Sequence, residues 1–317
     1  MTPNKKQESN PALRMMENGD YEGAKQALLQ SLLINQEMFG PNSSETAEDH
    51  RNLGAVYYRM LDFDQAKEHF ETALSIDLEC FGSQDAQVAV DQANLANILQ
   101  ELGEWEPAEA LFRQALAIDQ RNYGEDSLEA ANHLSAIAGL AYRRGDNFQA
   151  QPLYEAALAI VRNHLGDRHG ETAILLSSLG MVNEALGGYA AALSNYQDAL
   201  HIAEEVFGSR HRYIASLHNH VGGVYLHTKN FIAAIQSYQI AFEIDQAALG
   251  NHPHPSLARD LNNLGSAYEL NGQYEQALLY YREAVQMLEL LLTSHHPHVK
   301  GIKQNIQHVE NLLRKAE

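Results

Sequence analysis

A short phrase recurs every 42 residues along this chain: a small or polar residue, a polar or acidic residue, an aromatic residue, two variable residues and then alanine. The aromatic position is held by Tyr21, Phe63, Trp105, Tyr189 and Phe231 at this spacing, and Asn147 fills the remaining place. The last copy, at Tyr274, comes one residue late. A fixed period between 20 and 50 residues predicts a solenoid, which presents a long surface and seldom a closed catalytic pocket.

Each copy of the period predicts two helices. Leu53, Gly54 and Tyr57 form one stripe at helical spacing, and a second apolar stripe at helical spacing begins at Phe63 after a break near Asp62. A Phe-Gly pair at 81–82 then ends the second helix, since glycine is the usual residue just beyond a helix. Neither helix of such a hairpin can bury its apolar face alone, so successive hairpins must stack.

The pattern of Leu, Gly or Ala and Tyr in the first helix, followed by aromatic and Ala residues in the second, resembles the tetratricopeptide repeat over roughly residues 12–314. The 42-residue period, longer than the usual 34, resembles the kinesin-light-chain-like branch, as do the phrases at 261–268 and 272–277. Nothing in the sequence resembles the coiled coil that would join a motor heavy chain, so a kinesin role is not predicted. The resemblance implies an all-α fold: a right-handed superhelical α-solenoid of about seven helix hairpins with a C-terminal capping helix.

The predicted organisation has three parts. Residues 1–11 are expected to be a flexible N-terminus, and residues 12–296 the solenoid, with a truncated first repeat. Residues 297–317 are expected to form the capping helix, because polar residues such as Lys303 and Gln307 suit a solvated outer face.

Composition limits the possible partners and the location of the protein. The net charge of −19, from 22 basic and 41 acidic residues, argues against nucleic acid or an anionic membrane as the ligand. No apolar run is long enough for a membrane span or a signal peptide, and the one cysteine, Cys80, cannot form an intramolecular disulfide. We therefore expect a cytoplasmic protein, and we expect Cys80 to be buried beside Phe81.

The resemblance also implies where a ligand would bind, because the first helices line the inner groove of tetratricopeptide superhelices. If Leu53, Gly54 and Tyr57 pack inward, Asn52 and Arg59 share a neighbouring face of that helix. In related proteins an Asn in the place of Asn52 often binds a peptide backbone, a role that suits an amide with both donors and an acceptor. The residues predicted to line the peptide-binding groove are Asn52, Arg59, Asn94, Asn97, Arg143, Ser178, His220, His227 and Asn263.

Histidines in the loops raise the question of a metal site. His169, His211 and His254 precede predicted first helices, where they can act as helix-start residues, and a metal site is the alternative. The chain lacks a glycine-rich phosphate loop, a nucleophile elbow and a Cys-x-x-Cys pair. We predict no metal, no cofactor and no enzyme activity.

The sequence thus predicts a non-enzymatic interaction module that binds a protein or an extended peptide, with no role in nucleic-acid or membrane binding. One alternative is a scaffold that self-associates as a homo-oligomer through its ends or its convex face, since the truncated first repeat leaves an apolar end at Leu13, Met15, Met16, Leu28 and Leu32. Another is a sensor or adaptor subunit for an effector on another chain.

Overall fold

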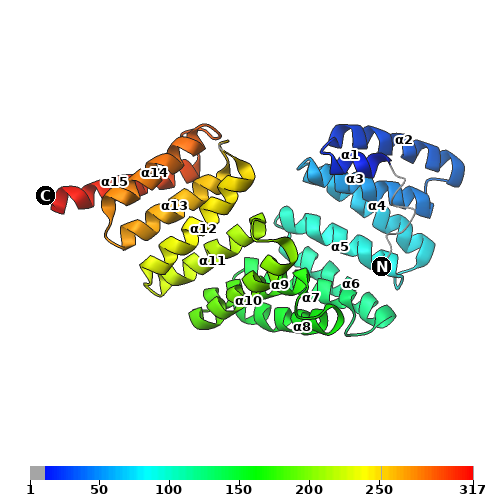
Figure 1. Cartoon of the computed structure of the whole chain (residues 1–317). Coiled ribbons are helices and arrows are strands. Elements are labelled where there is room, and N and C mark those ends of the chain that lie inside the picture. Colours follow the sequence, from blue (N-terminus) through cyan, green and yellow to red (C-terminus); the bar gives the residue numbers. More distant parts are fainter. Residues whose placement is uncertain (1–10, 251, 317) are drawn as a thin grey trace. The chain divides into compact units, whose positions relative to one another are not determined.

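The computed structural model describes residues 11–250 and 252–316. Over these residues it contains fifteen helices and no strand, and consecutive helices pack as antiparallel hairpins (Figure 1). The all-α fold of stacked helix hairpins expected from the sequence is confirmed. The helices are α1 (Pro11–Glu17), α2 (Tyr21–Phe39), α3 (Ser44–Arg59), α4 (Phe63–Phe81), α5 (Ala86–Glu101), α6 (Trp105–Tyr123), α7 (Leu128–Arg143), α8 (Asn147–Leu165), α9 (Gly170–Ala185), α10 (Tyr189–Phe207), α11 (Arg212–His227), α12 (Phe231–Leu249), α13 (Pro255–Leu270), α14 (Tyr274–Glu289) and α15 (Pro297–Ala316).

Helix lengths follow the 42-residue period. The first helices of the repeats, from α3 to α13, each have 16 residues, and the second helices, from α2 to α12, each have 19. Many helix starts are capped by a side chain: Asp62 accepts from the backbone N–H of Gln65, and Ser43 accepts from that of Thr46. The turn inside each hairpin contains one residue with positive φ, which is glycine except at Leu61 and Lys229.

Each hairpin from α3–α4 to α13–α14 has an aromatic ring on the second helix at the position that faces a small residue of the first helix. A Cβ added to Gly54 would lie 2.9 Å from the Phe70 ring, and one added to Gly265 would lie 2.6 Å from the Tyr281 ring. Glycine at these positions therefore allows the helices to approach closely, despite its cost in a helix interior. Within each of the two units described below, Figure 1 shows helix pairs that lie side by side.

The chain divides into two compact units. The N-terminal unit is Met1–Ile160 and the C-terminal unit is Val161–Glu317, so the division falls within α8. Each unit has its own buried cores of Ala, Leu, Ile and aromatic side chains. We describe the two units separately.

The two ends of the repeat array are incomplete in different ways. α1 has 7 residues where other first helices have 16, and it begins at Pro11, within the segment predicted to be flexible; the rest of that predicted segment lies outside the described residues. α15 continues the first-helix pattern, because Pro297 and buried Val299 stand 42 residues after Pro255 and buried Leu257. Lys303 and Gln307 lie exposed on α15, as the predicted solvated face requires.

Two further expectations can be compared with the structure. Cys80 is exposed, and its thiol donates to the backbone carbonyl of Asn42 at 3.3 Å, so the prediction that it is buried was wrong. Its neighbour Phe81 is also about half exposed, because this last turn of α4 extends beyond the packed part of the hairpin. None of the helices in the described residues has the length and apolar character needed to cross a membrane.

Candidate functional site

The predicted groove residues lie on the first helices, and none of them is buried. Arg59, Asn97, Arg143 and His227 are exposed. The partly buried ones are Asn52, Asn94, Ser178, His220 and Asn263. We call the surface formed by these positions the first-helix surface and treat it in each unit separately.

In the N-terminal unit, the first-helix surface carries amides with no partner. Among the described residues, no hydrogen bond engages the side chains of Asn52, Asn94 or Asn97, whereas Arg143 is 3.4 Å from Glu101 of the preceding first helix. Asn52 and Asn94 occupy equivalent places in α3 and α5, 42 residues apart. Their donors and acceptors are therefore available to a ligand.

In the C-terminal unit, the predicted residues contact other residues of the protein. Asn263 donates to the Asn219 side chain at 2.9 Å, and Ser178 donates to the backbone carbonyl of Ile174 at 3.1 Å. His220 and His227 stack on tyrosine rings of the second helix α10, with ring centroids 5.1 Å apart in both pairs. These side chains are therefore less available than the amides of the N-terminal unit.

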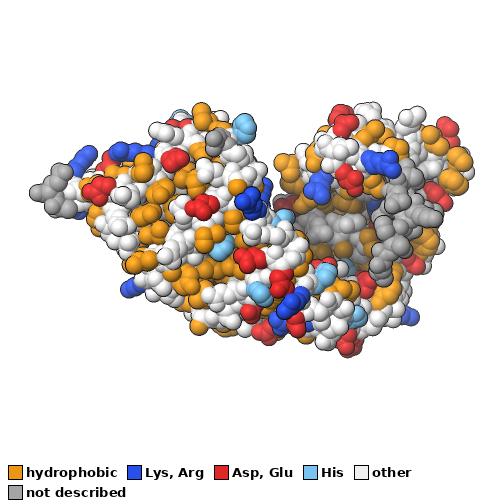
Figure 2. Space-filling view, in the orientation of Figure 1, with side chains coloured by type: hydrophobic (Ala, Val, Ile, Leu, Met, Phe, Trp, Pro, Cys, Tyr) orange, Lys and Arg blue, Asp and Glu red, His pale blue; other side chains and the backbone are white. Residues whose placement is uncertain are grey.

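Two glutamates, which the sequence analysis did not select, organise the first-helix surface of the C-terminal unit. Tyr196 donates to Glu184 at 3.0 Å, and Tyr281 donates to Glu269 at 2.7 Å. A histidine of the next first helix lies 3.6 Å from each carboxylate. Burial raises the pKa of the Glu184 carboxyl above its usual range, although the Tyr196 hydroxyl opposes this effect. In the space-filling view, acidic and histidine side chains lie among apolar ones on the visible face of this unit (Figure 2).

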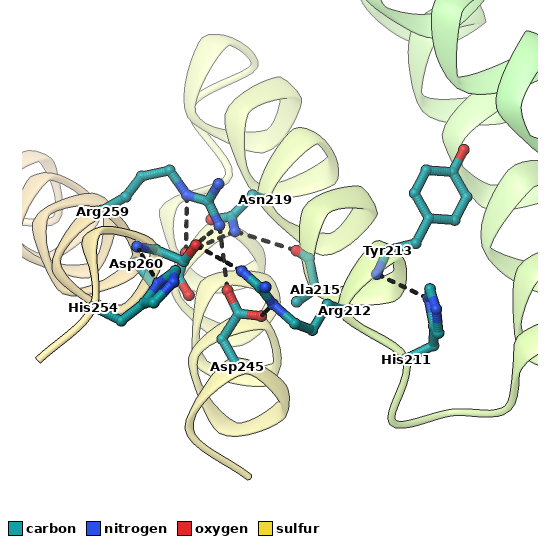
Figure 3. A network of polar contacts seen from close by, with 10 residues as sticks. His211, Arg212, Tyr213, Ala215, Asn219, Asp245, His254, Arg259 and Asp260 are labelled. Atoms are coloured by element: carbon teal, nitrogen blue, oxygen red, sulfur yellow. Dashed lines mark hydrogen bonds and ion pairs between the residues drawn. The ribbon is translucent and has the colours of Figure 1, made fainter. Parts of the chain in front are cut away.

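A second unpredicted feature is a cluster of charged residues around two buried aspartates in the C-terminal unit, between α11, α12 and α13 (Figure 3). Asp245 and Asp260 are almost fully buried, and Arg259 reaches Asp260 at 2.9 Å and Asp245 at 3.5 Å. Arg212 lies 3.5 Å from Asp245, and Asn219 donates to Asp260 at 2.8 Å. Burial raises the pKa of Asp260 to about 6, against the opposing effect of the Arg259 guanidinium.

The N-terminal unit holds counterparts of this cluster at equivalent positions. Arg51 pairs with buried Asp77 and lies 3.3 Å from buried Asp91, and burial raises the pKa of Asp91 to about 7. In the next layer, His133 and Asp119 form a buried pair at 2.9 Å. The Asp residues at 77, 119 and 245 share one position of the period, so their recurrence at an otherwise apolar helix position could have revealed these pairs from sequence.

A cavity of about 550 Å³ lies in the C-terminal unit between α13, the end of α14 and α15. Its walls include apolar side chains such as Leu288, Leu292 and Ile302, and polar side chains of Arg259, Asn262 and Asn305. Asn305 stands 42 residues after Asn263, so it was missed because the groove positions were not extended into the last helix.

The loop histidines cap helices. The Nδ1 atoms of His169, His211 and His254 accept backbone N–H groups at the starts of α9, α11 and α13, and His296 caps α15 in the same way. Within residues 11–250 and 252–316, no group of three or more His, Cys, Asp or Glu side chains is arranged to hold a metal ion.

Hairpins of 16- and 19-residue helices that repeat every 42 residues define a helical repeat protein. The family model described as tetratricopeptide repeat matches residues 13–79, 84–147, 129–205 and 213–289. These matches cover more than half of the chain, so the chain belongs to the tetratricopeptide repeat family. No protein with a curated description matches it in sequence.

Similar solved structures include kinesin-light-chain-like repeats. BtubC (BKLC) from P. vanneervenii is 21% identical, with a TM-score of 0.60 over 79% of this chain and 94% of that chain. The TPR-like repeats of a putative kinesin light chain from P. anserina are 20% identical, with a TM-score of 0.55 over 61% of this chain and 92% of that chain. The apo form of RapI is 19% identical, with a TM-score of 0.66 over 88% of this chain and 96% of that chain. At these identities the likenesses establish a shared fold.

Proposed function

We propose that this protein is a non-enzymatic, cytoplasmic interaction module that binds an extended segment of a partner protein on its first-helix surface. The observation that carries the proposal is the set of unengaged amides at Asn52, Asn94 and Asn97 in the N-terminal unit. Asn52 and Asn94 place the same amide at the same position of two successive repeats.

The amide group suits recognition of a peptide backbone. It offers two N–H donors and a carbonyl acceptor, and can therefore bind both the C=O and the N–H of an extended chain. The spacing of Asn52 and Asn94 by one repeat would place successive amides along the bound segment. Arg59, exposed at the end of α3, would add a charged contact to an acidic side chain or a carboxylate.

The proposal is tested by replacing Asn52, Asn94 and Asn97 together with Ala and using the variant as bait in affinity capture from the native cell. We expect at least one abundant partner of the wild-type bait to be lost by tenfold or more, because several backbone hydrogen bonds are removed at about 1 kcal/mol each. The matched control replaces Glu71, Ser75 and Glu106, which are exposed on second helices, with Ala. Equal capture by the wild-type and the Asn variant would contradict the proposed binding site.

Self-association is a second candidate function, and one observation favours it. Ile34 of α2 is 48% exposed, whereas Ile76 and Ile118 at the same position of the period are 5% and 4% exposed. Leu33, Met38 and Phe39 are also exposed around it, while Leu28 of the predicted apolar end is buried. This face of α2 is exposed because α1, with 7 residues, is too short to cover the 19 residues of α2.

Light scattering over a range of concentrations tests this candidate. A dimer would be expected to dissociate in the variant Ile34→Glu with Met38→Glu, because charge is then placed in a contact that must be apolar. A wild-type chain that stays monomeric at the highest concentration would rule the scaffold out.

A further inference from the structure

We propose that the cavity between α13, α14 and α15 is a subsite for one large apolar side chain of the bound partner segment. The proposal rests on the proposed peptide-binding function and names a second contact for it, in the C-terminal unit. The cavity's volume of about 550 Å³ lies within the usual range for ligand sites and leaves room for a residue together with its flanking peptide groups.

A helical glycine, Gly301, borders the cavity. Gly301 stands 42 residues after Arg259, at the same position of the next first helix, and a Cβ added to it would meet no atom within 4 Å. A glycine that neither contacts a neighbouring ring nor adopts a positive φ weakens the helix without a packing reason. Its effect here is to leave open space next to Arg259.

Apolar residues line the cavity at positions that hold charged residues in the preceding layer of helices. Leu288 and Ile302 occupy the positions at which the preceding layer holds the buried Asp245 and Asp260. Together with Leu292 they give the cavity an apolar wall, which favours burial of an apolar side chain in proportion to its area.

The polar atoms around this wall suit the peptide groups beside such a side chain. Asn262 and Asn305 line the cavity and are joined by a hydrogen bond of 3.4 Å from the Asn305 amide. Arg259 is held by Asp245 and Asp260 through its Nε and Nη2 atoms, and its Nη1 atom engages no group in the described residues. Figure 3 shows this guanidinium fixed between the two carboxylates.

The charge of the cavity also distinguishes it from the rest of the molecule. No Asp or Glu is among its lining residues, although the chain has a net charge of −19. A carbonyl oxygen of the ligand therefore meets donors at Arg259 and Asn305 without facing a carboxylate. A neutral apolar residue, with its two peptide groups, fits these walls better than a basic side chain does.

The test uses capped single residues as probes: the N-acetyl amides of leucine, phenylalanine and tryptophan, with N-acetyl-asparagine amide as the polar control. Binding to the full chain is followed by NMR shifts of the Leu288, Leu292 and Ile302 methyl groups. We expect saturable shifts with millimolar Kd for the apolar probes and none for the asparagine probe. Gly301→Leu places an isobutyl group in the open space beside Arg259 and should weaken binding at least tenfold, whereas Gly301→Ala adds one methyl group and should change it less than threefold.

Both Gly301 variants should melt at or above the temperature of the wild type, since each replaces a helical glycine that has open space around it. A loss of probe binding therefore cannot be attributed to unfolding. Absence of methyl shifts in the wild type, or equal binding by Gly301→Leu, would overturn the proposal.

Affinity capture separates this proposal from the proposed function. If Gly301→Leu and the Asn52, Asn94 and Asn97 variant both lose the same partner, both proposals are supported. If the capped residues fail to bind while the Asn variant still loses its partner, the cavity proposal falls and peptide binding stands. If the probes bind but neither variant loses a partner, the cavity is a ligand site and the proposed function falls.

Discussion

The first-helix surfaces of the two units use the same positions of the same repeat in opposite ways. In two successive hairpins of the N-terminal unit the packing aromatics are Phe70 and Phe112, which have no polar group, whereas the next hairpin of that unit holds Tyr154. On the first helices of the two Phe hairpins, the amides of Asn52 and Asn94 have no hydrogen-bond partner among the described residues. In the C-terminal unit the packing aromatics Tyr196 and Tyr281 carry hydroxyl groups to Glu184 and Glu269 at the surface.

The difference shows how one repeat pattern can carry two kinds of surface. A packing Phe has no hydroxyl that could bond to polar residues at the surface, so those residues are available to a ligand. A packing Tyr donates its hydroxyl to a glutamate at the surface, so that the glutamate is held by a residue of the core. The predictions below test this contrast, from the largest expected effect to the smallest.

The largest effect is expected from removing a packing aromatic. Tyr281→Ala should destabilise the C-terminal unit, and Phe112→Ala the N-terminal unit, by about 3–5 kcal/mol each, because both rings are buried. Tyr281→Phe keeps the ring and should cost about 1–2 kcal/mol for the lost hydrogen bond to Glu269. Hydrogen exchange of the helices in each unit measures these changes separately. If Tyr281→Phe had no effect, the hydroxyl would not couple the core to the surface as we describe.

The buried carboxylates predict a dependence of stability on pH. Folding raises the pKa of Asp91 to about 7 and that of Asp260 to about 6, from 3.8. The folded state then holds the proton more tightly, so each group's contribution to stability is largest below pH 4 and declines as the pH rises toward the folded value. Burial is the main cause of the raised pKa in both groups, and the neighbouring carboxylates of Asp77 and Asp245 add to it, against the opposing effects of Arg51 on Asp91 and of Arg259 and Asn219 on Asp260.

This prediction is checked with Asp91→Asn and Asp260→Asn. Between pH 4 and pH 7 the difference in unfolding free energy between wild type and variant should change by roughly 1–3 kcal/mol for Asp91 and by less for Asp260. Comparison with the wild type removes the contribution of the other acidic residues. Parallel pH profiles for the wild type and both variants would show that neither group titrates with a raised pKa.

A smaller effect is expected from a single methyl group placed between paired helices. Gly222→Ala would put a Cβ 2.6 Å from the Tyr238 ring, and the overpacking should cost about 1–3 kcal/mol, less about 1 kcal/mol gained from the better helix former. Ala96 and Ala138 occupy the position of Gly222 in two other hairpins, opposite Phe112 and Tyr154. The interface therefore accepts alanine when the packing of the two helices is adjusted to it. A Gly222→Ala variant more stable than the wild type in thermal unfolding would show that α11 and α12 can adjust in the same way.

The smallest effect concerns the hairpin turns, one in each unit, that lack the usual glycine. Leu61 and Lys229 have φ values of 62° and 61°, where the other turns hold glycine. Replacing either with Gly removes strain but adds freedom to the unfolded chain, so we expect a gain of up to about 1 kcal/mol. Similar shifts of the melting temperature are expected from both variants, and a loss of stability in either would mean that the side chain contributes packing that offsets its strain.

The sequence by itself determined the repeat and its fold. The 42-residue spacing, the Gly or Ala beneath each aromatic and the glycine after each second helix predicted the helix pairs, because close helix packing and helix termination depend on single residue types at fixed positions. The same alignment placed the nine groove residues on solvent-accessible positions of the first helices. Their role in binding stays a prediction.

Only the tertiary structure decided which of those residues are available. Asn52 and Asn263 occupy equivalent positions, yet among the described residues Asn52 has no hydrogen-bond partner, whereas Asn263 donates to Asn219 of the preceding first helix. The charged cluster around Asp245 and Asp260 and the cavity beside Gly301 likewise join residues from three helices each. Periodicity fixes the position of each residue on its own helix, whereas hydrogen bonding, burial and open space depend on side chains that meet only when the helices stack.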